Sequence, residues 1–192
     1  MNIISLFPTA IGDFSDFITE YERLELFENI KNISHHPHDQ LTGNGFSTHT
    51  LQNDFMSKTI KDRIQSTANE YAKFYGLQSV KVGGMWSNIQ HSGSCLNEHT
   101  HPNSIVSGSL YINVDETCKL YFHNPNPYNG FTQYDKANDF NYQFVWINVK
   151  NCQLILFPSW LKHGKNNEVN MMDDRVVVSF NCNYDNKDLI KI

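Results

Sequence analysis

The sequence has little positive charge and no long apolar run. Lys and Arg number 15 against 20 Asp and Glu, which gives a formal net charge of −5 at pH 7. Lys and Arg form no patch-sized cluster, so non-specific nucleic-acid binding and electrostatic attachment to a membrane are not expected. No window is long and apolar enough for a membrane span, and the opening MNIISLFPTAIGDF lacks the basic start of a signal peptide. We expect a cytoplasmic protein, of the cell or of an infected host cell, that acts on a small molecule or a peptide.

Cysteine is also scarce and is not arranged for metal or redox chemistry. The four residues are Cys95, Cys118, Cys152 and Cys182, and no two of them have CxxC spacing. This excludes a zinc ribbon and a thioredoxin-like motif, and it predicts reduced thiols in the core.

The first third of the chain predicts two helices within a single domain, residues 1–192. Residues 15–33 place apolar side chains at roughly helical spacing, with Ser15 or Asp16 as the N-cap. Residues 53–75 carry a clearer apolar stripe, with Asn53 or Asp54 as the N-cap and Gly76 just after the helix end.

From residue 79 onward the pattern changes to short β-rich runs separated by turn-forming residues. These runs cover residues 79–90, 104–114, 119–123, 143–150, 152–158 and 175–184. Helices followed by strands predict a mainly β, α+β chain, a sandwich or jelly roll buttressed by the N-terminal helices. Residues 124–142 have no period and many turn formers, so we expect a long loop there and hypothesise that it is a substrate lid.

Two histidines stand one residue apart in NEHTHPNSIVSGSLYINV. Residues i and i+2 of a strand share a face, so His99 and His101 would lie about 7 Å apart along the backbone and could chelate a metal. His163 follows the apolar run LILFP and is the third candidate, and three facial imidazoles would leave metal positions open. Ordinary hydrogen-bonded histidines remain the alternative. His35, His36 and His38 look similar, but we expect them to lie in a solvated loop.

An arginine begins the last β-rich run. In DRVVVSFN, Arg175 shares a face with Val177, Ser179 and Asn181. An arginine on the histidine-bearing side needs an anion, and its planar fork matches a carboxylate, so a dicarboxylate cosubstrate is a natural partner. The alternative is an ion pair with Asp173 or Asp174.

Together these segments resemble the Fe(II)- and 2-oxoglutarate-dependent oxygenase superfamily, and within it a group of short bacterial and phage-type members. The resemblance rests on LFPTAIG, GFSTHTL, MWSNIQHSGSCLNEHTHPNSIVSGSLYINV, LYFHNP, LILFPSWLKHG and DRVVVSFN, in that order. It implies a double-stranded β-helix, a cupin-like jelly roll. It also implies a triad of His, a carboxylate two residues later and a distal His, with an Arg about a dozen residues further on.

Carried over by resemblance, His99 and His163 are metal ligands and Arg175 holds the far carboxylate of 2-oxoglutarate. His101 occupies the carboxylate position, which gives the site one more unit of positive charge than the usual triad. The side chains expected to hydrogen-bond the cosubstrate are Asn88, Ser107, Tyr111, Ser179 and Asn181. The implied activity is a dioxygenase that uses Fe(II) and O₂, hydroxylates a substrate C–H bond, and releases succinate and CO₂.

Two alternatives stay open. One is a three-histidine non-haem iron dioxygenase that does not use 2-oxoglutarate, or a zinc protein, in which Arg175 binds the substrate carboxylate. The other is a non-catalytic jelly-roll binding or structural module. A homodimer formed through an exposed edge strand is open as well.

Overall fold

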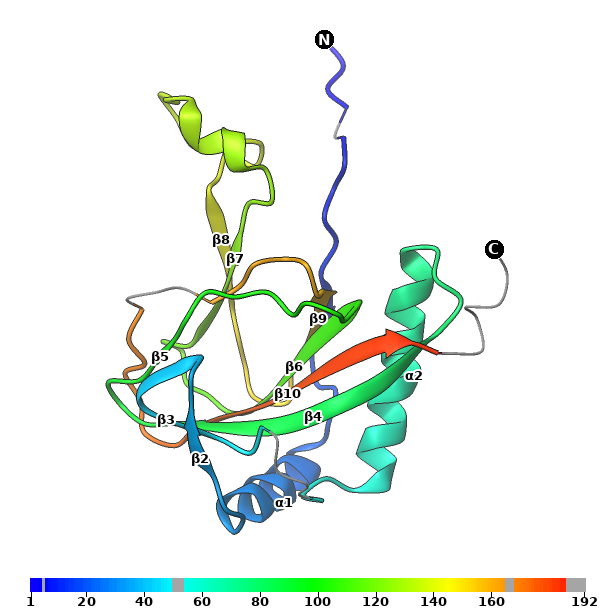
Figure 1. Cartoon of the computed structure of the whole chain (residues 1–192), viewed down its shortest axis with the longest axis vertical. Helices are drawn as coiled ribbons and strands as arrows, with labels where there is room; N and C mark the ends of the chain where they lie inside the picture. Colours follow the sequence, from blue (N-terminus) through cyan, green and yellow to red (C-terminus); the bar gives the residue numbers. More distant parts are fainter. Residues whose placement is uncertain (5, 50–53, 165–167, 186–192) are drawn as a thin grey trace.

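The fold is built around one large, curved antiparallel sheet. A computed structural model describes residues 1–4, 6–49, 54–164 and 168–185. The sheet has the strand order β1-β9-β6-β10-β4-β3-β2, with β5 paired to β3 (Figure 1). Its strands are β1 (Gly12–Phe14), β2 (His36–His38), β3 (Leu41–Ser47), β4 (Val80–Gln90), β5 (Cys95–Leu96), β6 (Val106–Asn113), β9 (Leu154–Pro158) and β10 (Arg175–Tyr184).

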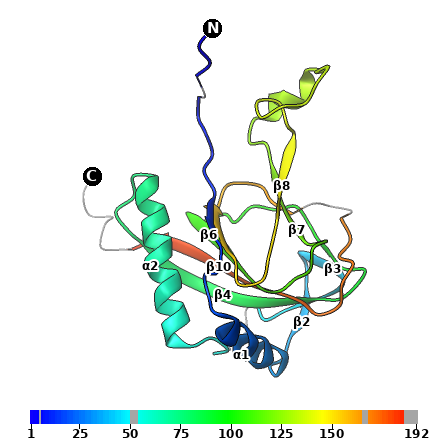
Figure 2. The same ribbon diagram turned by 180° about the vertical axis from the view of Figure 1, so that it is seen from behind.

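Two helices cover one face of this sheet. They are α1 (Glu20–Lys31), which contacts β6, and α2 (Lys58–Phe74), which contacts β4 (Figures 1 and 2). The expected stripe of α2 is buried, with Ile60, Ile64 and Ala68 at 3% exposure or less. These side chains pack against Val176, Val178 and Phe180 of β10, among others, in the larger apolar core of the protein.

The predicted helix starts were wrong by several residues. Thr19, not Ser15 or Asp16, caps α1, because its hydroxyl accepts a hydrogen bond from Glu22 N while the Glu22 carboxylate accepts one from Thr19 N. Ser57, not Asp54, caps α2, and Asn53 lies outside the described residues. The end of α2 was right, since Gly76 follows the helix with φ of +77°.

The other face of the large sheet meets a two-stranded sheet made of β7 (Lys119–His123) and β8 (Phe144–Asn148). A second apolar cluster, which includes Leu120, Phe122, Phe157 and Val177, fills part of the space between the two sheets. Two facing antiparallel sheets with helices outside make the predicted jelly roll.

All six predicted strands are present, but β1, β2, β3 and β5 were missed. Residues 35–39 were expected to be a solvated loop, yet β2 pairs there with β3, Pro37 opposite Phe46. The pairing partner is the Gly- and Asn-containing β3, whose composition is weak evidence for a strand in isolation. Strand β1 is only three residues long, and β5 only two.

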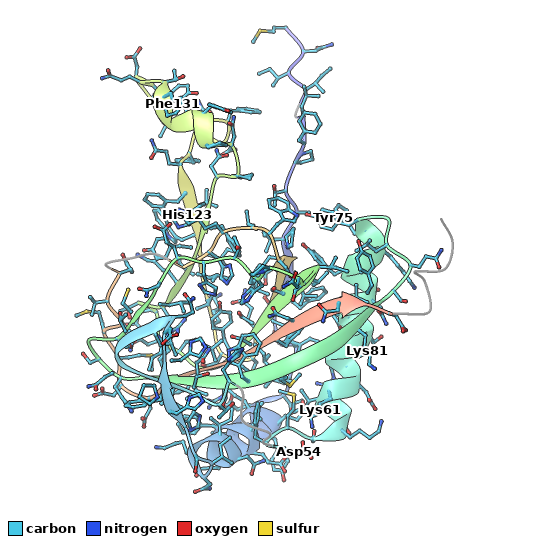
Figure 3. The ribbon with its side chains drawn as sticks, viewed as in Figure 1. Asp54, Lys61, Tyr75, Lys81, His123 and Phe131 are labelled. Carbon is cyan, nitrogen blue, oxygen red and sulfur yellow. The ribbon has the colours of Figure 1, made fainter. Side chains whose placement is uncertain are left out.

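Residues 124–142 form the extended tip of the β7–β8 hairpin. They contain a short 3-10 helix, η1 (Pro127–Phe131). In Figure 3, His123 marks the point where the hairpin leaves the body and Phe131 lies at its far end. The tip thus projects away from the body, and the lid hypothesis does not describe its position in this structure.

Within the part of the chain that the structure describes, no helix is both long and apolar enough to cross a membrane.

Candidate metal centre

Three imidazoles converge between the two sheets. The ring centroids of His99 and His163 are 4.3 Å apart, those of His99 and His101 4.9 Å, and those of His101 and His163 5.0 Å. One ligand nitrogen from each residue lies within 4.8 Å of the other two. The structure thus brings together the three histidines that the sequence suggested.

Backbone pairing holds the three positions. His99 N donates to His163 O at 2.9 Å and His163 N donates to His99 O at 3.0 Å, which makes a two-residue bridge between distant segments. His101 N donates to Ser159 O at 2.9 Å. Gly164 follows with φ of +84°, and a Cβ there would come within 2.6 Å of Asn97 O, so the close approach requires glycine. Gly93, six residues before His99, also has a positive φ, of +88°.

The rings are oriented through their Nδ1 atoms. His99 Nδ1 lies 2.7 Å from Asn97 O, and His163 Nδ1 lies 3.0 Å from Leu161 O. A carbonyl oxygen can only accept, so each Nδ1 carries the proton and each Nε2 keeps its lone pair. His101 differs, because its Nδ1 lies 3.4 Å from the side-chain amide Nδ2 of Asn181.

Burial keeps these imidazoles neutral. Desolvation lowers the pKa of His99, lowers the pKa of His101 to about 4, and holds the pKa of His163 well below its usual range. The neighbouring histidines contribute to the last two shifts. Neutral imidazole is the metal-binding form, so the site is in its ligand state at neutral pH.

The donor set fits a divalent transition metal. Three neutral imidazoles on one side of an ion, two of them with a free Nε2, match the preferences of Fe, Zn, Cu or Ni and leave further coordination positions for other ligands. Glu98, the carboxylate nearest in sequence, accepts a salt bridge from Lys162 at 2.5 Å and lies 3.6 Å from His123. Among the described residues, the group placed to hold a metal consists of these three histidines.

A pocket of about 670 Å³ opens beside the three histidines. Its wall from β10 includes Arg175, Val177 and Ser179, as expected from alternation along the strand. The neighbouring strands add residues of the same face, because Arg175 pairs with Gln90, and Ser179 pairs with Ser109.

Arg175 points along this wall rather than into solution. Its Nη1 donates to Gln90 Oε1. The predicted alternative, an ion pair with an adjacent aspartate, is not formed, because Asp174 pairs with Lys31 at 3.0 Å and Asp173 accepts a hydrogen bond from Ser92 N. The guanidinium thus faces the pocket with an uncharged partner.

The other predicted cosubstrate contacts divide into two groups. Asn88, Tyr111 and Ser179 line the pocket. Ser107 and Asn181 instead hydrogen-bond to each other at 2.8 Å beside His101. Period-2 alternation correctly placed Arg175, Val177 and Ser179 on the pocket face, but it does not say how far along the strand the pocket extends.

Several pocket residues were missed from the sequence. Gln90 could have been found, because it continues the i, i+2 series of Trp86 and Asn88. His38 and His49 also line the pocket, with ring centroids 4.8 Å apart, and neither was given a site role. Their contribution depends on the β2–β3 pairing, which the sequence did not predict.

Comparison with known proteins agrees with this geometry. Residues 84–181, just over half of the chain, match the family described as "Putative 2OG-Fe(II) oxygenase". No curated protein sequence matches the chain significantly.

Several solved structures are similar in fold. HygX from Streptomyces hygroscopicus, with nickel, 2-oxoglutarate and hygromycin B bound, has a TM-score of 0.62 at 10% identity, covering 91% of this chain and 83% of HygX. The viral collagen prolyl hydroxylase of Paramecium bursaria Chlorella virus-1, as a 2-oxoglutarate complex, has a TM-score of 0.61 at 12% identity, and the match covers 91% of this chain and 96% of the hydroxylase. The non-haem α-ketoglutarate-dependent epimerase SnoN of nogalamycin biosynthesis has a TM-score of 0.63 at 12% identity, and the match covers 91% of this chain and 78% of SnoN.

At these identities the structural likeness establishes the fold, a jelly roll of 2-oxoglutarate oxygenase type. The sequence match includes His99, His101, His163 and Arg175. The chain belongs to the 2OG-Fe(II) oxygenase family.

Proposed function

We propose that the protein is an Fe(II)- and 2-oxoglutarate-dependent dioxygenase that hydroxylates a C–H bond of a small-molecule or peptide substrate. The observation that carries the proposal is the placement of three neutral imidazoles and one guanidinium around the same pocket. His99, His101 and His163 would hold the iron, and Arg175 would bind the far carboxylate of 2-oxoglutarate.

Iron bound there would supply the activation of O₂. In the overall reaction, 2-oxoglutarate would lose CO₂ to give succinate, and one oxygen atom would enter each of succinate and the product. The chain's own residues do the binding and positioning. One N–H of the Arg175 guanidinium, on Nη1, donates to Gln90. The remaining N–H groups would be available to a carboxylate of the cosubstrate. Asn88 and Ser179, 3.5 Å apart, add an amide and a hydroxyl to the same wall.

The pocket has room for a substrate beside the cosubstrate. Its volume of about 670 Å³ lies in the range of ordinary ligand sites. Trp86 and Phe157 are apolar lining residues, at 9% and 1% exposure, and they keep bulk water from the histidines. Lys119, Tyr121 and Glu168 also belong to the lining and would present polar contacts to the substrate.

A second function is favoured by one specific feature, the histidine at position 101. A site without a protein carboxylate gives the metal no anionic protein ligand, so a three-histidine dioxygenase without 2-oxoglutarate remains the competing proposal. In that case Arg175 would bind the carboxylate of the substrate itself.

The test is an anaerobic titration of Fe(II)-loaded protein with 2-oxoglutarate, followed by the visible charge-transfer band of a chelated keto acid. We expect the band in the native protein and in Lys81→Ala, which removes an exposed cation near the start of β4 (Figure 3) that does not line the pocket. We expect Arg175→Ala to require at least tenfold more 2-oxoglutarate. Tight iron binding without a band would overturn the use of 2-oxoglutarate and favour the three-histidine dioxygenase.

A further inference from the structure

His101 is held by a different kind of contact from its two partners. His99 and His163 each direct Nδ1 to the carbonyl two residues earlier in the chain. His101 Nδ1 instead meets a side chain, Asn181, which comes from a strand eighty residues away. The histidine that replaces the carboxylate of the usual triad is thus the one with a side-chain partner.

That partner belongs to a closed ring of hydrogen bonds. Ser107 Oγ donates to Asn181 Oδ1 at 2.8 Å and lies 2.8 Å from Ser159 Oγ. The backbone carbonyl of Ser159 accepts from His101 N at 2.9 Å. The network therefore starts at the imidazole of His101 and returns to its own backbone.

The ring is well shielded from solvent. Ser107 is 1% exposed and Ser159 is fully buried, and Asn181 is half-buried. Strand pairing holds Ser107 and Asn181 next to each other, because they lie directly opposite in the β10–β6 register. Buried hydroxyls and amides are costly unless they are hydrogen-bonded, so this arrangement is held in place.

The chemistry of the amide links this ring to metal binding. An Asn side chain has an acceptor on one arm and donors on the other, and the two arms fill the same space. With Nδ2 toward His101, the amide donates to Nδ1, and the proton of the imidazole sits on Nε2. With the amide reversed, Oδ1 accepts from Nδ1–H, and Nε2 is free for a metal. Ser107 and Ser159 accommodate both orientations, because a hydroxyl both donates and accepts.

We propose that Asn181 is a positioning residue for the metal centre, whose amide, anchored by Ser107 and Ser159, sets the tautomer of His101 and so presents Nε2 to the metal. This inference rests on the proposed metal site but not on the use of 2-oxoglutarate. Partners of this kind typically change metal affinity 10- to 100-fold when removed.

The test is Co(II) affinity, measured by optical titration for the native protein, Asn181→Leu, Asn181→Asp and Asn183→Leu. Asn181→Leu removes the partner at similar volume, and we expect a 10- to 100-fold weaker affinity. Asn181→Asp supplies a permanent acceptor, and we expect native affinity or tighter. Asn183→Leu, an exposed position two residues further along β10, should match the native protein within twofold.

A second measurement separates positioning from general stability. ¹⁵N NMR of the metal-free proteins reports which nitrogen of His101 carries the proton, and we expect Nδ1–H in Asn181→Asp. Equal Co(II) affinity in all variants would overturn the inference while leaving the proposed function intact. Equal losses in Asn181→Leu and Asn181→Asp would also overturn it. Failure of the native protein to bind Co(II) would overturn both proposals.

Discussion

Strand β10 has two faces that do different work. Val176, Val178 and Phe180 are fully buried against the helix side of the sheet. Arg175 and Ser179, which alternate with them, face the pocket. One strand thus supplies the core through even-numbered positions and the site through odd-numbered ones. The two roles are separable by single substitutions, which should affect stability or ligand binding but not both.

The largest effect is expected on the core face. Phe180→Ala should lower the free energy of unfolding by about 3–5 kcal/mol, because it opens a cavity over Gly108 and beside Leu156, where the fully buried Phe180 ring packs. Urea unfolding measures this. Ser179→Ala, on the opposite face, should change it by less than about 1 kcal/mol. If Phe180→Ala lowered the free energy of unfolding by less than about 1 kcal/mol, the core face of β10 would not contribute more to stability than the pocket face.

On the pocket side, the largest change should follow loss of a metal ligand. His163→Ala should weaken Fe(II) or Co(II) binding at least 100-fold, about 3 kcal/mol, because two imidazoles replace three. Calorimetric titration gives the affinity, and circular dichroism checks the fold. His91→Ala removes a histidine paired with Asp174 and should bind metal as the native protein does. Unchanged affinity in His163→Ala would exclude the all-histidine site.

Acid should affect the metal-free protein through the same histidines. The pKa of His101 is lowered to about 4 in the folded state, while the unfolded chain takes up the proton near pH 6.5. Between these values the unfolded state binds more protons, so stability is present above pH 6.5 and is lost as pH falls toward 4. From pH 7 to pH 5 the loss from His101 should be about 2 kcal/mol.

The measurement is urea unfolding of native protein and His101→Gln at pH 7 and pH 5. The variant should lose less stability than the native protein. Paired carboxylates act at lower pH, since Arg63 holds the pKa of Glu22 at about 2 in the folded protein and its contribution is lost below about pH 4.5. Identical losses in both proteins would show that His101 is not protonated on unfolding in this range.

The smallest effect should come from a single neutral donor in the pocket wall. Ser179→Ala should weaken 2-oxoglutarate binding about three- to tenfold, or about 0.7–1.4 kcal/mol, the usual contribution of one hydrogen bond. Anaerobic titration of the iron-loaded protein measures it, with Ser92→Ala, an exposed position, as control. A loss as large as that of Arg175→Ala would mean that Ser179 has a further role.

The sequence predicted the parts of this comparison that depend on short-range periodicity. Alternation along DRVVVSFN placed Arg175 and Ser179 on one face, and that prediction was right. The helix stripe of α2 was also right. Both patterns depend only on the repeat of a regular element, which neighbouring residues reveal.

Features that depend on pairing between distant segments were not predictable in this way. Strand β2 exists because β3 lies beside it, and the pocket gains His38 and His49 from that pairing. Ser107 and Asn181 were assigned to the cosubstrate, yet they hydrogen-bond to each other. Ser107 also contacts Ser159, the residue just after β9, so the three side chains form a network separate from the pocket wall. Their depth along the jelly roll is set by tertiary packing, which the local sequence does not encode.

The bridge between His99 and His163 has a consequence for the order of events during synthesis. The two residues are far apart in the chain, and a contact between them requires closing a long loop, which slows folding. A nascent chain that has left the ribosome only as far as residue 101 carries two of the three imidazoles, but it lacks His163, which pairs with His99 in the folded protein. The complete set of ligands exists only after the second sheet has closed, so metal capture should report a finished fold.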